Sequence, residues 1–178
     1  MGNELFSKII GRLKQNSSFP DWWESDEIET PFFDNKKLTV TYMDLDPKTD
    51  VTFIGEADMA LSNFFKLNAD DRNSFSDLAY KNCMDFLELV GYDEADEQLR
   101  LIKDKNEIWN FIYPNQICLQ RRHKNDKDIY VVLDCECEWE KEHGLRFVFK
   151  QGKWLTRISE IDGHITDEDA YGIPDEED

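Results

Sequence analysis

The sequence predicts an α+β fold, in which a C-terminal antiparallel β-meander and an N-terminal β-hairpin pack against a block of helices. Apolar residues follow a helical period in the middle of the chain and a period of two in the C-terminal half. Turn signals rich in Gly, Asn and Asp separate the alternating segments. A block of helices beside runs of strands is typical of the α+β class.

The N-terminal part predicts one helix and one hairpin. In residues 3–14 the apolar residues recur at helical spacing, with Asn3 placed to cap the helix. We expect this amphipathic helix to pack on the core, and docking to a membrane surface or a partner is the alternative. Two short strands, 28–33 and 38–43, flank an Asp-Asn-Lys turn signal and predict the hairpin.

Three helices are predicted in the middle of the chain. The first covers residues 58–67, and the second covers 75–90 and ends at Gly91. The third covers 93–105, where acids come early and bases late, an order that complements the helix dipole.

The C-terminal half predicts the meander. Its expected strands cover residues 107–112, 117–122, 129–139, 145–149 and 153–159. In 129–139 every odd position is apolar or Cys and several even positions are acidic, which predicts one core face and one face in water. A two-residue turn at Gln151-Gly152 would place Phe149 opposite Trp154, Phe147 opposite Thr156 and Leu145 opposite Ile158. We expect Trp139 and Trp154 to be core anchors.

Length and charge bound the organisation and the partners. We expect a single domain over residues 1–172 and an acidic tail over 173–178. The net charge is −18, and residues 160–178 hold nine acids without Lys or Arg. This charge disfavours direct nucleic acid binding, which depends on Lys and Arg. A basic protein partner or a cation is compatible with it, and solubility alone is the other interpretation.

The compartment is predicted from what the chain lacks. No apolar run approaches the ~20 residues that cross a bilayer, and the first residues lack the pattern of a signal peptide. We therefore expect a cytoplasmic protein with no membrane association. The four cysteines are expected to be reduced thiols. The sequence contains no P-loop, G-x-S-x-G or H-E-x-x-H motif, and no cofactor is predicted.

Residues 135–145 contain two thiols, four carboxylates, an imidazole and an indole. Cys135 and Cys137 fall on the predicted core face, where small buried residues are the simplest interpretation. The alternative is a metal site formed by Cys135, Cys137, His143 and His164, although one Cys-x-Cys is a weak zinc signal. A thiol nucleophile is disfavoured because acidic neighbours raise the pKa of a thiol.

A ridge of carboxylates is expected on the other face of the same strand. It consists of Asp134, Glu136, Glu138, Glu140 and Glu142. Such a ridge could bind Ca²⁺, pair with Lys and Arg of a partner, or be a solvated face. Residues 142–144 are expected to form the hairpin corner, where Gly144 supplies a positive φ.

The segment 137–145 reads Cys-Glu-Trp-Glu-Lys-Glu-His-Gly-Leu, and an apolar strand, a Gly turn and Asp-Gly-His at 162–164 follow it. This pattern resembles a signature of a bacterial family of small acidic α+β domains of unassigned function. Trp22 and the Pro-Phe-Phe at 31–33 extend the resemblance. It implies a bacterial cytosolic stand-alone protein, and some similar domains act as immunity proteins that block toxins. The resemblance supplies no catalytic residue.

Two functions therefore follow from the sequence. The first is a non-enzymatic binding protein whose acidic ridge occludes a basic partner such as a nuclease-type toxin. The second is a metal-binding module or metal-dependent enzyme built on the two cysteines and two histidines.

Overall fold

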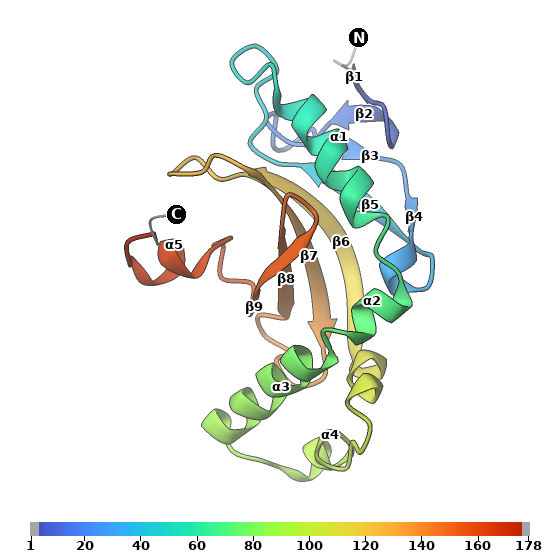
Figure 1. Cartoon of the computed structure of the whole chain (residues 1–178), viewed down its shortest axis with the longest axis vertical. Helices are drawn as coiled ribbons and strands as arrows, with labels where there is room; N and C mark the ends of the chain where they lie inside the picture. Colours follow the sequence, from blue (N-terminus) through green and yellow to red (C-terminus); the bar gives the residue numbers. More distant parts are fainter. Residues whose placement is uncertain (1–3, 176–178) are drawn as a thin grey trace.

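The computed structural model describes residues 4–175 and shows one mixed sheet flanked by short helices (Figure 1). Within these residues the sheet has nine strands in the order β1-β2-β3-β5-β6-β7-β8-β9, and β4 pairs with β5 beside this path. The predicted α+β class is confirmed. The strands are β1 (Glu4–Ser7), β2 (Gly11–Gln15), β3 (Trp23–Ser25), β4 (Ile28–Thr30), β5 (Lys36–Tyr42), β6 (Ile112–Arg121), β7 (Ile129–Cys137), β8 (Leu145–Lys150) and β9 (Trp154–Ser159).

The helix expected over residues 3–14 is wrong, because β1 and β2 form an antiparallel hairpin there. Leu5 lies opposite Leu13 in this hairpin, and Leu13 is fully buried. Phe6, on the other face of the strand, is 66% exposed. The helical spacing of apolar residues was therefore accidental. Asn3, the expected cap, lies outside the described residues.

Side-chain and backbone contacts at the tip of this hairpin explain why the segment forms a hairpin and not a helix. Ser7 Oγ accepts the backbone N–H groups of Ile9 and Ile10, at 3.1 Å each, and donates to Asp58 Oδ1 at 2.5 Å. Gly11 follows with φ +80°, a conformation in which glycine has no steric cost. Because Asp58 belongs to a helix 51 residues further on, a long-range contact stabilises the turn.

The predicted N-terminal hairpin is confirmed. β4 pairs antiparallel with β5, and Ile28 lies opposite Leu38. The chain turns through a short 3-10 helix, η1 (Pro31–Phe33), and then through Asp34 and Asn35, whose φ values are +53° and +62°. Asn and Asp tolerate this left-handed conformation better than other side chains, which is why the turn signal was informative.

Three helices follow β5 along the chain and precede β6: α1 (Phe53–Phe64), α2 (Ala69–Asn73) and α3 (Ser76–Val90). The short α4 (Glu97–Arg100) also precedes β6, and α5 (Asp167–Tyr171) comes near the end of the chain. The predicted helix over 75–90 is confirmed as α3, which ends at Gly91. The helix expected over 58–67 is α1, which starts five residues earlier. In the described part of the chain, none of the helices has the length and apolar character needed to cross a bilayer.

The single helix expected over residues 93–105 is wrong. The structure has a 3-10 turn η2 (Glu94–Asp96), one turn of helix α4 (Glu97–Arg100), and a second 3-10 segment η3 (Lys105–Phe111). Asp93 Oδ1 accepts the Ala95 N–H at 2.6 Å, and Asp104 Oδ1 accepts the Asn106 N–H at 3.0 Å. Each aspartate starts a new helical turn, so the segment breaks. The strand expected over 107–112 is largely η3 for the same reason.

The C-terminal meander is confirmed as β6, β7, β8 and β9, each antiparallel to the next. β5 pairs with β6 in parallel, with Val40 opposite Ile117. A parallel pair needs a long crossover, and the helical block provides it. The N-terminal strands therefore join the meander in one curved sheet, along which α1, α2 and α3 are arranged (Figure 1).

The predicted pairing of β8 with β9 is wrong. The turn has three residues, so Lys150 lies opposite Trp154 and Phe149 opposite Leu155. The register then shifts by one extra residue in β9, and Phe147 lies opposite Ile158. As a result Trp154 is 55% exposed and is not a core anchor, whereas Trp139 is buried as expected.

Contact with α1 explains this turn. A Cβ on Gly152, where φ is +69°, would lie 2.0 Å from the backbone oxygen of Ala60. Asn63 Nδ2 donates to the backbone oxygen of Gln151 at 3.0 Å. The turn is therefore shaped by the helix on which it rests, which the local sequence could not show.

Both faces of the meander are covered. On one face an aromatic core packs under α1 and α3, and ring centroids of Phe32, Phe64 and Phe149 lie 5.2 to 5.7 Å apart. On the other face a second apolar cluster is covered by the chain after β9, and it consists of Cys118, Tyr130, Val132, Val148 and Ile165. The expectation that one face of 129–139 is in water is therefore wrong for most of β7, whose even positions are buried up to residue 134.

Candidate functional site

The two thiols of the segment 135–145 are enclosed in the core. Cys135 is fully buried and Cys137 is 4% exposed, and both are free thiols. Burial raises the pKa of Cys137 to about 11 and raises the pKa of Cys135 well above its ordinary value. Both side chains are therefore protonated near neutral pH. This placement fits their interpretation as small core residues.

Asp134 is part of a buried ion pair. Its two carboxylate oxygens accept hydrogen bonds from Arg146 Nε at 2.7 Å and Arg146 Nη2 at 3.0 Å. The two residues face each other across β7 and β8, and their side chains are only 8% and 6% exposed. The charge of Asp134 is neutralised within the sheet.

Three carboxylates of the expected ridge are accessible at the end of β7 and in the turn after it. Glu136 and Glu142 are exposed. Glu138 is half-buried, accepts a hydrogen bond from the Tyr113 hydroxyl at 3.0 Å and lies 3.6 Å from Lys141 Nζ. Because the strand ends at residue 137, these side chains do not form one continuous row.

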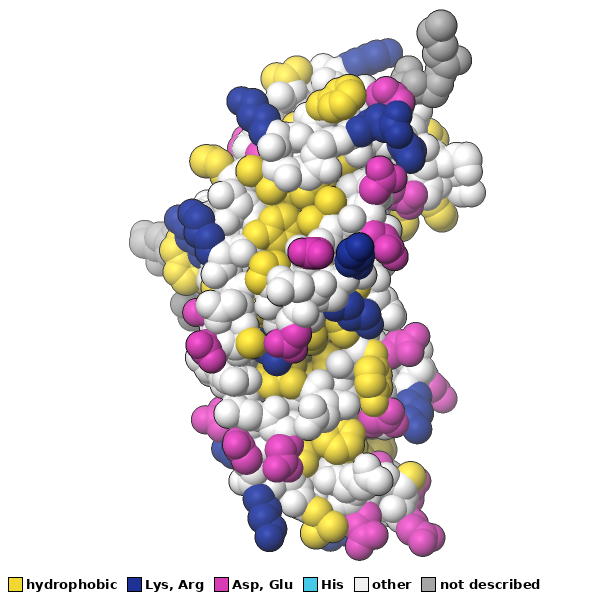
Figure 2. Space-filling view, turned by 90° about the vertical axis from the view of Figure 1, so that its right-hand side faces the viewer, with side chains coloured by type: hydrophobic (Ala, Val, Ile, Leu, Met, Phe, Trp, Pro, Cys, Tyr) yellow, Lys and Arg dark blue, Asp and Glu magenta, His cyan; other side chains and the backbone are white. Residues whose placement is uncertain are grey.

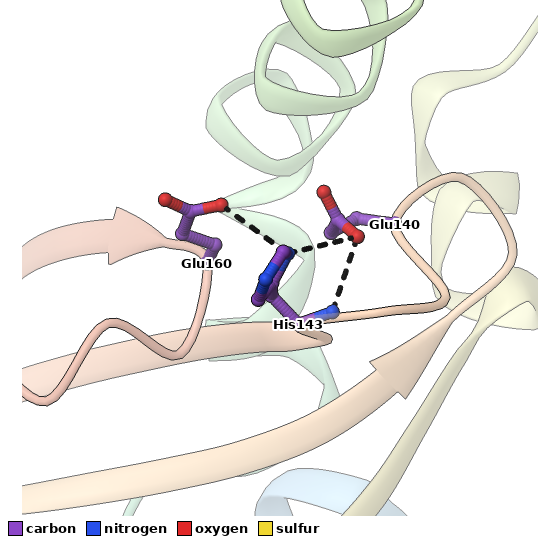
Figure 3. A group of neighbouring side chains, drawn as sticks. All are labelled: Glu140, His143 and Glu160. Atoms are coloured by element: carbon purple, nitrogen blue, oxygen red, sulfur yellow. Dashed lines mark hydrogen bonds and ion pairs between the residues drawn. The ribbon is translucent and has the colours of Figure 1, made fainter.

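The fifth carboxylate, Glu140, is buried and shapes the turn. Its Oε1 accepts the backbone N–H groups of Glu142 and His143, at 3.0 and 3.1 Å. The imidazole of His143 lies between Glu140 and Glu160 (Figure 3). The distances from His143 Nδ1 are 3.5 Å to Glu140 Oε1 and 3.8 Å to Glu160 Oε2.

Glu140, His143 and Glu160, called here the carboxylate-histidine cluster, offer three ligand atoms within 4.8 Å of one another. Imidazole and carboxylate groups suit divalent transition metals. The four residues predicted as metal ligands do not come together. Within residues 4–175 the cluster of possible ligands includes His143, but it includes neither Cys135 nor Cys137 nor His164. Sequence reasoning missed Glu160, which β9 brings back to the turn.

Buried arginines tie the chain after β9 to the sheet. The Arg157 side chain is 3% exposed, and it donates to Asp162 at 2.6 and 2.9 Å and to Asp167 at 2.6 Å. Hydrogen bonds from Arg157 lower the pKa of Asp162 to about 2. Sequence reasoning missed these pairs, and the available signal was an arginine inside an apolar strand followed by an acid-rich segment.

Arg122 repeats this arrangement further along the segment. Its side chain is 6% exposed, and its guanidinium donates to Asp169 at 2.9 and 3.1 Å and to Asp175 at 2.7 Å. Asp175 belongs to the predicted acidic tail, so at least this carboxylate is held against the sheet. Residues 176–178 lie outside the described part of the chain.

A groove runs between α3 and β9, and we call it the β9–α3 groove. It consists of two connected hollows of about 260 and 390 Å³. Both are lined by Asn82 and Asp85 from α3 and by Arg157 and Ile158 from β9. The larger hollow reaches Glu140 and Glu160, so the carboxylate-histidine cluster lies beside one end of the groove.

The chain has 39 acidic and 21 basic side chains, so carboxylates outnumber cations outside the buried ion pairs as well. Four guanidinium groups with side chains no more than 11% exposed are enclosed by eight carboxylates. Figure 2 views the side that carries β4 and α2, where apolar side chains form a broken band and acidic ones gather toward the end at which α4 lies.

The fold and the site define an acidic α+β domain with a groove along one sheet edge and buried thiols. Residues 9–165 match the family model described as a domain of unknown function (DUF6985), and the chain belongs to this family. Comparisons with curated proteins and with solved structures give no match.

Proposed function

We propose that the protein is a non-enzymatic binding protein whose acidic surface occludes a basic protein partner. The observation that carries this proposal is that the buried arginines are paired with acids, whereas several glutamates are exposed. The most buried cations are neutralised inside the molecule, whereas Glu136, Glu142 and Glu160 remain exposed around one turn. A surface of this kind attracts Lys and Arg side chains of a partner and repels acidic proteins.

The resemblance of the segment 137–145 to small acidic bacterial domains supports a more specific role. Some similar domains are immunity proteins, which are cytosolic and block toxins. A nuclease-type toxin is basic because it binds phosphates, so an acidic inhibitor complements it. We therefore propose an immunity-type role in the bacterial cytosol.

The experiment is affinity capture from lysate of the source cells with identification by mass spectrometry, at about 0.1 M and about 1 M salt. The wild type is compared with Glu136→Lys/Glu138→Lys and with a control that changes the charge equally elsewhere, Glu27→Lys/Glu29→Lys. We expect a basic protein that is held at low salt, released at high salt and lost by the first variant only. A wild type that retains the same proteins as both variants, or none, contradicts the proposal.

The geometry of the carboxylate-histidine cluster favours a second candidate, binding of a divalent metal. Glu140, His143 and Glu160 already converge, and the imidazole is the ligand that selects a transition metal over Ca²⁺. Calorimetric titration with Zn²⁺ and with Mn²⁺ tests this function. One equivalent bound by the wild type and by His164→Ala, but not by His143→Ala, supports it. Equal binding by all three proteins, or no binding, rejects it.

A further inference from the structure

We infer that the β9–α3 groove binds an extended segment of the partner that carries Lys or Arg, and that this segment adds to the sheet as a strand beside β9. The inference rests on the proposed function, since it names the part of the basic partner that is held and the place that holds it. Three features of the groove lead to it: a free sheet edge, an apolar wall and an excess of carboxylates.

The first feature is the free edge of β9. This strand ends the order of the sheet and pairs with β8 on one side. In the chain between residues 4 and 175, no backbone hydrogen bond joins the other side of β9 to another segment. Unpaired N–H and C=O groups on a sheet edge are a template for an added strand. β9 contains no proline, and its one charged side chain, Arg157, is buried and paired with aspartates.

The second feature is an apolar wall on the facing helix. Leu78 and Leu89 of α3 both line the groove and are 51% and 84% exposed. Leu155 and Ile158 of β9 are partly buried on the opposite side. Side chains of an added strand alternate between its two faces, so every second one can contact this wall. Such a groove suits a segment with apolar residues at alternate positions.

The third feature is charge. Five carboxylates and two cationic groups line the groove, which gives a formal charge of −3: the carboxylates are Asp85, Glu140, Glu160, Asp162 and Asp167, and the cations are Lys81 and Arg157. Glu160 is exposed at one end and Asp85 is 58% exposed on α3. The remaining positions of the bound segment are therefore complemented by Lys or Arg. A segment without charge would leave the excess negative charge of the groove uncompensated.

The experiment begins with selection of a phage-displayed library of random ten-residue peptides on the wild-type protein. We expect enriched sequences that alternate apolar residues with Lys or Arg. A synthetic peptide of the enriched sequence should bind about tenfold more weakly to Asp85→Lys/Glu160→Lys. The matched control Glu88→Lys/Glu29→Lys changes the charge equally outside the groove and should keep wild-type affinity. Circular dichroism and thermal unfolding check that both variants are folded.

Backbone pairing is tested on the same peptide. N-methylation of alternate amides in one register should abolish binding, whereas methylation of the other register should not, because only one edge of the peptide faces β9. Hydrogen exchange should show new protection of the amides of Trp154–Ser159 when the unmodified peptide binds.

Three results would overturn the inference. They are a library without enrichment, a peptide that tolerates methylation in both registers, and protection of β9 by a second copy of the chain in a concentration-dependent dimer. Each leaves the capture of a basic partner in place, so the proposed function stands while the groove is excluded as its site. If capture fails while the peptide binds as expected, the basic segment is recognised and the occluding role is wrong.

Discussion

Removal of one partner from the buried Asp134–Arg146 pair should destabilise the protein strongly. The replacement Asp134→Leu leaves Arg146, whose side chain is 6% exposed, without a carboxylate partner. An uncompensated buried charge of this kind costs about 3–5 kcal/mol. For a domain of this size each kcal/mol lowers Tm by about 2–4 °C, so we expect a decrease of about 6–20 °C.

The double replacement Asp134→Leu/Arg146→Leu removes both charges and should behave differently. Replacing a buried ion pair by apolar side chains is often neutral or stabilising by about 1–4 kcal/mol, because the desolvation of both ions is avoided. The double variant should therefore be more stable than Asp134→Leu alone. The exposed pair Arg12–Glu4, 3.2 Å apart with both side chains 47% exposed, is the control, and Glu4→Ala should cost at most about 1 kcal/mol.

The assay is urea unfolding followed by tryptophan fluorescence, with Tm from calorimetry as a second measurement. Two results would contradict this prediction: Asp134→Leu costs less than about 1 kcal/mol, or the double variant is as unstable as the single one. The first result would mean that Arg146 reaches solvent when its partner is removed, and the second that the loss arises from packing and not from an unpaired charge.

Gly152→Ala should destabilise the protein by about 2–5 kcal/mol, because strain at positive φ adds to the collision with the Ala60 backbone. In the control Gly163→Ala the new Cβ meets nothing within 4 Å, so this change should cost only about 1–2 kcal/mol. Equal losses of stability in thermal unfolding would contradict the contact of Gly152 with α1. Hydrogen bonds from Arg157 lower the pKa of Asp162 from 3.8 to about 2, so this carboxylate stabilises the fold above pH 3.8 and its contribution is lost as the pH falls toward 2. The urea midpoint should decrease over this pH range in the wild type and decrease less in Asp162→Asn. Parallel curves for the two proteins would show that Asp162 does not cause the pH dependence. Burial raises the pKa of Cys83 and of Cys118 to about 12 and the pKa of Cys137 to about 11. Thiol reagents at pH 7 should therefore label the native protein slowly and the urea-unfolded protein at all four cysteines. Rapid labelling of the native protein would show that the core opens around these cysteines.

Several elements could be predicted because local chemistry decides them. α3 has a full apolar stripe and a glycine at its end, and both signals act within the helix itself. The β4–β5 hairpin follows from Asp34 and Asn35, which accept positive φ without help from the rest of the fold. The alternation in β7 predicted that Cys135 and Cys137 face the core, and they do.

Other elements could not be predicted because distant contacts decide them. The apolar residues of the first segment fit either a helix or a hairpin, and the contact from Ser7 to Asp58 favours the hairpin. The segment 93–105 is an exception, since local caps at Asp93 and Asp104 interrupt a helix whose charge order predicted one continuous element. In the site, Glu160 meets His143 only because β9 returns antiparallel to β8.

The α+β class, the core position of the thiols and the acidic character of the protein follow from period, turn chemistry and composition alone. Which charges remain available depends instead on the tertiary structure. Arg122, Arg146 and Arg157 are buried beside acids as far as 53 residues away in the chain, so their charges are neutralised within the fold. Sequence reasoning counts those charges but cannot pair them, because pairing depends on which segments the fold brings together.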